Sequence, residues 1–261
     1  MNLNCFCRSL LALIMTTTMS FASALDTVQV DVAPYLWATS MQGTVQVGPK
    51  RVSISQSFFD LMKHFEGGGM LFVNVHQNRW GLFGNALYSV LEDSHDFHKD
   101  NHDFHKIRVR ARNNFGIVSG GLSYTFFLKP VFDTPSPDLT LELLAGARAT
   151  FNDTNVTLGH FAFKDNKLWT DPIVGARVTV PLKPRIHFIA EADAGKVHSH
   201  HSYDAQAYLG YQPVNPLLFN NVTLYVGYRY LHQYFSTGHK LNYYLWDMAI
   251  KGPVLGFKAM F

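Results

Sequence analysis

Apolar and polar residues alternate with a period of two along most of the chain after residue 25. The alternation is clear in Leu139-Thr140-Leu141-Glu142-Leu143 and returns at 186–193 and 222–226. Because successive side chains of a β-strand point to opposite faces, this period predicts strands. Several of the strands that it predicts reach ten residues or more, beyond the ~5–6 residues common in soluble sheets. We therefore expect an all-β chain whose only helix is a short one at 58–65.

Charged residues occupy one face of the alternating runs, and Leu, Val, Ile, Phe, Ala and Tyr occupy the other. A soluble barrel or sandwich buries the apolar face, whereas a transmembrane barrel turns that face to lipid and encloses the polar one. An unpaired buried charge costs several kcal/mol, so charges enclosed in a barrel are expected to neutralise each other. The predicted lumen charge network is Glu142, Arg148, Asp171, Arg177, Glu191, Asp193, Asp204 and Arg229.

Features of the strand ends favour the transmembrane barrel over a secreted soluble sandwich. The chain ends on Phe261, with Phe257 on the same face, which resembles the assembly signal of Gram-negative outer-membrane barrels. Tyr and Trp gather near strand ends, as they do in the girdles at bilayer interfaces. The expected girdle residues are Tyr35, Trp37, Trp80, Tyr88, Tyr124, Trp169, Tyr211, Tyr228 and Tyr230. Short turns alternate with longer polar segments, and the expected extracellular loops are 94–106, 152–168 and 233–246.

Bacterial single-chain barrels have an even number of strands. Counting back from Phe261 gives ten: 248–261, 221–232, 203–211, 186–197, 169–180, 138–151, 107–127, 80–92, 68–77 and 27–40. The two alternating pieces of 43–66, TVQV and VSIS, are shorter than the ~9–11 residues that span a bilayer. We therefore expect 43–66 to form an extracellular hairpin with a short helix, folded over or into the mouth. Eight or twelve strands are the alternatives.

The first 24 residues have the order of a secretory signal peptide. Arg8 precedes an apolar stretch at 10–21, and Ala22-Ser23-Ala24 forms a small-residue cleavage site. The predicted mature chain is one barrel domain, 25–261. Both cysteines, Cys5 and Cys7, lie in the signal, so the mature barrel is expected to contain no disulfide.

Five motifs resemble a broad family of Gram-negative outer-membrane β-barrel proteins across nearly all of the mature chain. They are YLWATS at 35–40, RWGLF at 79–83, WTDPIVGAR at 169–177, GYRY at 227–230 and GPVLG at 252–256. The resemblance implies a fold and a location in the cell outer membrane, and no activity. That location implies outer-membrane lipid, lipopolysaccharide, periplasmic chaperones and the barrel-assembly machinery as partners. The net charge of +3 and scattered Lys and Arg argue against nucleic-acid binding.

Histidines cluster in segments expected at the outer end, where HDFHK is nearly duplicated within 95–106. Imidazole is the commonest metal ligand in proteins, so these residues could bind a divalent transition metal weakly. The candidate ligands are His95, His98, His102, His105, His198, His200 and His201. Their spacing matches no closed zinc site, and a solvated loop is the alternative, so we expect no dedicated cofactor.

The sequence favours a structural or surface-interaction barrel with a largely occluded lumen, because side chains mostly fill barrels of eight to ten strands. A small diffusion channel or a ligand-binding barrel is the alternative. A rim hydrolase acting on lipid or peptide is a third, since His200-His201-Ser202 lies close to Asp204, with Asp96 and Asp103 in the histidine-rich segment. No third side chain that would orient a His–Ser pair stands out in the sequence, so we expect no enzymatic activity.

Overall fold

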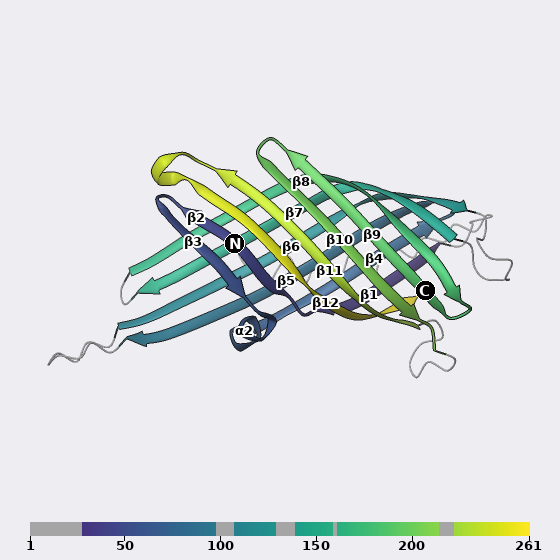
Figure 1. Cartoon of the computed structure of the whole chain (residues 1–261), viewed down its shortest axis with the longest axis horizontal. Helices are drawn as coiled ribbons and strands as arrows, with labels where there is room; N and C mark the ends of the chain where they lie inside the picture. Colours follow the sequence, from purple (N-terminus) through teal and green to yellow (C-terminus); the bar gives the residue numbers. More distant parts are fainter. Residues whose placement is uncertain (1–27, 98–106, 129–138, 159–160, 214–221) are drawn as a thin grey trace, which may run out of the picture.

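Ten antiparallel strands close into a barrel because β1 pairs with β4 on one edge and with β12 on the other (Figure 1). The structure, a computed structural model, describes residues 28–97, 107–128, 139–158, 161–213 and 222–261. The strands of the barrel are β1 (Gln29–Trp37), β4 (Phe65–Gln77), β5 (Trp80–Phe97), β6 (Ile107–Leu128), β7 (Leu139–Leu158), β8 (Phe161–Lys183), β9 (Ile186–Val197), β10 (His200–Tyr211), β11 (Val222–Thr237) and β12 (Tyr244–Met260). The prediction of ten spanning strands is confirmed. The predicted signal peptide lies outside the described residues.

Several strands run further than the sequence predicted. β7 and β8 pair through most of 152–168, and β11 and β12 cover much of 233–246, so these expected loops are largely strand. Asn113 explains part of the difference, because its amide donates to Asn152 Oδ1 at 2.7 Å and to Thr154 Oγ1 at 2.8 Å. These polar contacts link strands where polar residues interrupt the apolar alternation, which is why that pattern did not reveal them.

The predicted hairpin at 43–66 is present but extends the wall of the barrel. β2 (Ser40–Val47) pairs with the first half of β12, and β1 pairs with the second half, so β1 and β2 act as one interrupted strand. β3 (Lys50–Gln56) pairs with the other edge of β2. Gly252 faces the interruption, where a Cβ atom would collide with the backbone oxygen of Ala38.

The helix α2 (Phe58–Lys63) lies between β3 and β4, close to where the sequence predicted it. Ser57 starts it with a capping box, because the Ser57 hydroxyl accepts from the Asp60 amide and the Asp60 carboxylate accepts from the Ser57 amide. It ends at His64, whose carbonyl accepts a hydrogen bond from Glu92 N of β5 at 2.8 Å. No helix among the described residues is long and apolar enough to cross a bilayer.

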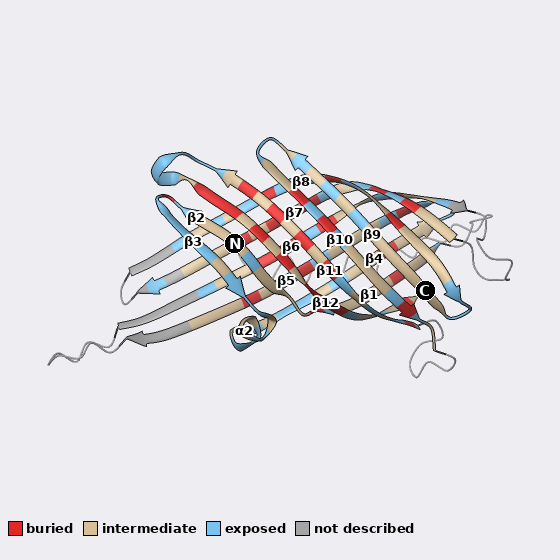
Figure 2. Ribbon diagram, in the orientation of Figure 1, coloured by how far each residue is buried: buried red, intermediate tan, exposed pale blue. Residues whose placement is uncertain are grey.

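Burial is inverted relative to a water-soluble protein (Figure 2). Leu36 and Val174 on the outer face are 72% and 67% exposed, whereas Arg148 and Asp171 inside are 1% and 0% exposed. An apolar exterior around a polar interior is the pattern of a transmembrane barrel. The fold is therefore that of an outer-membrane β-barrel, and the soluble sandwich is wrong.

Three of the residues expected in the aromatic girdles instead point into the lumen. Trp37 and Trp169 are buried there, and the Tyr35 hydroxyl donates to Asn85 Oδ1 at 2.9 Å. Aromatic rings can fill a lumen as readily as they face lipid. Only the face of the strand on which a ring lies distinguishes a lumen residue from a girdle residue. Trp80, Tyr88, Tyr211 and Tyr228 are exposed on the outside, as expected.

Candidate functional site

A layer of paired charges crosses the middle of the lumen. Arg148 of β7 donates to Asp193 Oδ2 of β9 at 2.7 Å and to Asp204 Oδ2 of β10 at 3.3 Å. Arg229 of β11 donates to the same Asp204 oxygen at 2.6 Å. These four side chains are almost completely buried, and the predicted mutual neutralisation is confirmed for them. Arg148 also donates to Ser202 Oγ at 3.2 Å, so the layer joins four strands.

A second group of charges lies nearer the end of the barrel that carries the C-terminus, which we call the C-terminal end. Arg177 of β8 donates to Glu142 Oε2 of β7 at 2.7 Å and to Glu191 Oε2 of β9 at 2.5 Å. Strand register places Glu142 opposite Arg177 and Arg177 opposite Glu191. The Arg177 guanidinium also lies 5.1 Å from the centroid of the Phe72 ring.

Asp171 belongs to the predicted network but forms no ion pair in the described structure. It lies opposite Arg148 in register, yet the guanidinium of Arg148 turns to Asp193 and Asp204. Neither carboxylate oxygen of Asp171 accepts a hydrogen bond of normal geometry, although Ser202 is close enough to interact. The prediction of pairing is therefore wrong for Asp171, because two other carboxylates occupy its potential partner.

Aromatic side chains fill the lumen toward the opposite end, which carries the β2–β3 hairpin and is called the hairpin end. Trp169 stacks on Phe235 at 4.6 Å between ring centroids, and Phe115 stacks on Trp246 at 5.7 Å. Leu231 and Met248 are fully buried in the same cluster. The alternating pattern did not reveal this plug, although Trp169 lies two residues from Asp171 and therefore shares its inward face.

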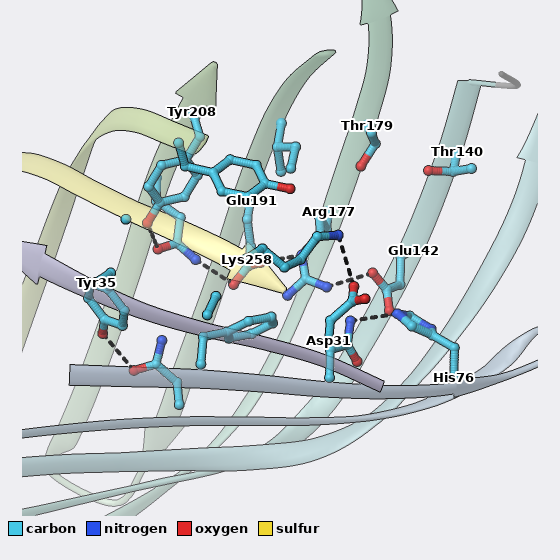
Figure 3. A pocket seen from close by; sticks show the side chains of 18 of the residues that line it. Asp31, Tyr35, His76, Thr140, Glu142, Arg177, Thr179, Glu191, Tyr208 and Lys258 are labelled. Atoms are coloured by element: carbon cyan, nitrogen blue, oxygen red, sulfur yellow. Dashed lines mark hydrogen bonds and ion pairs between the residues drawn. The ribbon is translucent and has the colours of Figure 1, made fainter. Parts of the chain in front are cut away.

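A cavity of about 580 Å³ occupies the C-terminal half of the lumen and reaches Asn78 in the β4–β5 turn (Figure 3). Charged side chains in its wall include Arg177 with its two glutamates, and Lys258, whose Nζ lies 2.9 Å from Asp31 Oδ2. Gln206 donates to Glu191 Oε1 at 2.7 Å, and the Tyr208 hydroxyl donates to Gln206 Oε1 at 2.6 Å. The lumen is thus open as a polar pocket at one end and filled at the other.

The candidate metal ligands that the structure describes do not converge. His200 points inward and lies 4.5 Å from the Phe235 ring, whereas His201 faces outward and stacks on Tyr234 at 4.9 Å. His198 lies in the exposed β9–β10 turn. Within the described residues no group of three or more His, Cys, Asp or Glu could hold a metal ion. His95 lies on β5 opposite Val109, and its side chain is not described; His98, His102 and His105 lie outside the described residues.

The residues weighed for a rim hydrolase occupy different surroundings. Ser202 is buried and accepts its hydrogen bond from Arg148, and Asp204 is held by both arginines of the central layer. His200 and Ser202 share the inward face of β10, because they lie two residues apart on one strand. Asp103 lies outside the described residues, and Asp96 belongs to β5.

Phe257 and Phe261, predicted as the assembly signal, are both exposed at the C-terminal end. The backbone of Phe261 exchanges two hydrogen bonds with Val30, of 2.9 and 3.1 Å, which extend the β1–β12 seam to the last residue. The role of Phe257 and Phe261 in barrel assembly stays a prediction.

Comparison with known proteins gives structural similarity only. No protein-family model and no curated protein matches the sequence. The structure is similar to solved Gram-negative outer-membrane barrels. The translocator domain of the autotransporter NalP from Neisseria meningitidis is 11% identical, with a TM-score of 0.38 over 98% of this chain and 95% of that one. Ail, the attachment invasion locus protein of Yersinia pestis, is 12% identical, with a TM-score of 0.34 over 91% and 100%. Neisserial surface protein A is 13% identical, with a TM-score of 0.27 over 89% and 94%. These TM-scores are too low to serve as evidence for the fold. The fold is assigned from the strand pairing alone.

Proposed function

We propose that this chain is a structural or surface-interaction barrel of the outer membrane whose lumen does not conduct. The observation that carries the proposal is the filling of the lumen by two successive layers. The central layer joins Arg148, Asp193, Asp204 and Arg229, and the aromatic plug follows toward the hairpin end. A continuous water path would need both layers to open.

The orientation follows from the general architecture of such barrels. We place the C-terminal end in the periplasm and the hairpin end outside, with outer-membrane lipid and lipopolysaccharide around the exposed apolar face. The barrel-assembly machinery and periplasmic chaperones are the partners expected during insertion. The proposal includes no enzymatic activity.

The β2–β3 hairpin supports an interaction role for the outer end. β3 is exposed along nearly its whole length, including Lys50, Arg51 and Val52. In the part of the chain that the structure describes, no strand pairs with its second edge. An exposed edge strand offers backbone donors and acceptors to a partner.

Conductance of purified protein in planar bilayers tests the proposal. We expect no steady conductance from the wild type, because the two layers close the lumen. Insertion is checked separately by comparing the gel migration of unboiled and boiled protein. A steady open conductance from inserted wild-type protein would overturn the proposal and favour the diffusion channel.

A further inference from the structure

Among the described residues that line it, the cavity in the C-terminal half of the lumen has one more carboxylate than cations. Asp31, Glu142 and Glu191 line it together with Arg177 and Lys258, which gives a formal charge of −1 with histidine counted as neutral. Both cations already have carboxylate partners, at 2.9 Å for Lys258 and at 2.7 and 2.5 Å for Arg177. An anionic ligand would have to displace one of these carboxylates, so the charge balance favours a cation.

Two buried atoms in residues of the cavity wall have no hydrogen-bond partner within the part of the chain that the structure describes, and both are acceptors. They are Asn74 Oδ1 and Glu142 Oε1. Asn74 is 3% exposed and Glu142 is 6% exposed, so both belong to the built interior of the barrel. Leaving such buried atoms unpaired costs free energy, because they have lost their hydrogen bonds to water. Both atoms are enclosed as the cavity stands, so a hydrogen-bond donor in the cavity reaches them once the Asn74 or Glu142 side chain rotates toward it.

The wall also offers aromatic rings to a positive charge. Tyr35, Phe72, Tyr208 and Tyr225 all line the cavity. The Arg177 guanidinium already lies 5.1 Å from the Phe72 centroid, within the range of a cation–π contact. The volume of about 580 Å³ falls in the range of small-molecule sites.

We propose that this cavity binds a small organic cation, a molecule with a primary ammonium or guanidinium group, at Glu142 and Asn74. The cation neutralises the excess carboxylate and donates hydrogen bonds to the two unpaired acceptors. The aromatic rings contact its apolar part. This site is additional to the proposed function, because a closed lumen does not require a ligand in its open half.

Calorimetric titration of the refolded barrel in detergent tests the proposal with 1,4-diaminobutane as the probe. Butane-1,4-diol serves as the neutral analogue of the same length, and succinate as the anionic one. We expect saturable binding of the diamine only. Absence of saturable diamine binding, or binding of succinate in its place, overturns the proposal.

Two variants locate the site and one serves as a control. E142Q keeps the shape of the side chain and removes its charge, so diamine affinity should fall at least about tenfold. T140W fills the cavity from β7 without removing a charge, and should abolish binding. D165N removes one carboxylate from the β7–β8 hairpin, outside the cavity, and should bind as the wild type does.

The gel-migration comparison shows which variants have folded. If E142Q does not fold, T140W decides, because its ion pairs remain intact. Diamine binding of wild-type strength in the folded cavity variants overturns the proposal, since the ligand then binds elsewhere. Equal weakening in D165N also overturns it, because the effect then reflects the overall charge of the protein.

Discussion

Trp169 and Phe235 stack across the lumen, with ring centroids 4.6 Å apart and ring planes inclined by 17°. Trp169 lies on β8 and Phe235 on β11, and two strands separate β8 from β11 around the wall. The contact therefore spans the interior. It makes two distant strands depend on each other and closes the lumen at the hairpin end.

Removing this contact should destabilise the barrel and weaken one of the two layers that close the lumen. W169A should lower the free energy of unfolding by about 3–5 kcal/mol, as expected for a buried aromatic side chain. Folding and unfolding titrations with urea in lipid vesicles measure this change. The matched control is W80A. Trp80 is 60% exposed on the outer face, so its truncation should lower the free energy of unfolding much less. An equal loss of unfolding free energy in W169A and W80A would contradict a stabilising aromatic plug in the lumen.

The double variant W169A/F235A should also shift the conductance. The plug then loses both stacked rings, so only the central layer still closes the lumen, and we expect brief openings in planar bilayers whenever that layer fluctuates, where the wild type is silent. A closed double variant would mean that the layer of Arg148, Asp193, Asp204 and Arg229 suffices to block the lumen.

Asp171 and Asp204 should respond oppositely to the same chemical change. D171N removes a buried charge that has no ion pair among the described residues, so we expect the free energy of unfolding to rise by about 1–3 kcal/mol. D204N removes the carboxylate shared by Arg148 and Arg229, which should cost about 3–5 kcal/mol. The same urea titrations compare the two variants. A destabilised D171N would show that this carboxylate has a partner after all.

The period of two was enough to predict the all-β class, the ten spanning strands and the inward face of the charges. It assigned Glu142, Arg177 and Glu191 correctly because the face of a strand residue depends only on local spacing. It could not assign Trp37 and Trp169, because an aromatic ring suits both lipid and a filled lumen. For Trp169, the spacing to Asp171 held the missing information.

Contacts between distant segments were beyond the sequence pattern. The pairing of β2 with β12 joins residues 40–47 to 244–251, and no local period encodes such a partner. The choice of Arg148 between Asp171, Asp193 and Asp204 likewise depends on where side chains meet inside the closed barrel. The β2–β12 pairing and the carboxylate partners of Arg148 are both determined by the closed barrel and not by local sequence.

The pKa of Asp60 should lie below its usual value of 3.8, because the carboxylate accepts hydrogen bonds from the Ser57 hydroxyl and backbone amide, with Lys63 nearby. A lowered pKa in the folded state means that its stabilising effect is present above the unfolded pKa and is lost as pH falls through the folded one. Carboxyl carbon chemical shifts in detergent micelles measure the titration. S57A should move the pKa back toward 3.8, since it removes the side-chain bond. An unchanged titration in S57A would contradict the capping box.

In intact cells, cysteines placed at the two ends of the barrel should differ in their reaction with a membrane-impermeant maleimide. Ser53 lies exposed on β3 at the hairpin end, and Arg79 lies exposed in the β4–β5 turn at the C-terminal end. S53C should react with a membrane-impermeant maleimide, whereas R79C should react only after the outer membrane is permeabilised, because we expect the C-terminal end in the periplasm. The wild type, treated in parallel, controls for Cys5 and Cys7, both of which lie in the predicted signal peptide. Labelling of R79C but not S53C in intact cells would invert the orientation, and the cavity of Glu142 and Asn74 would then face the outside.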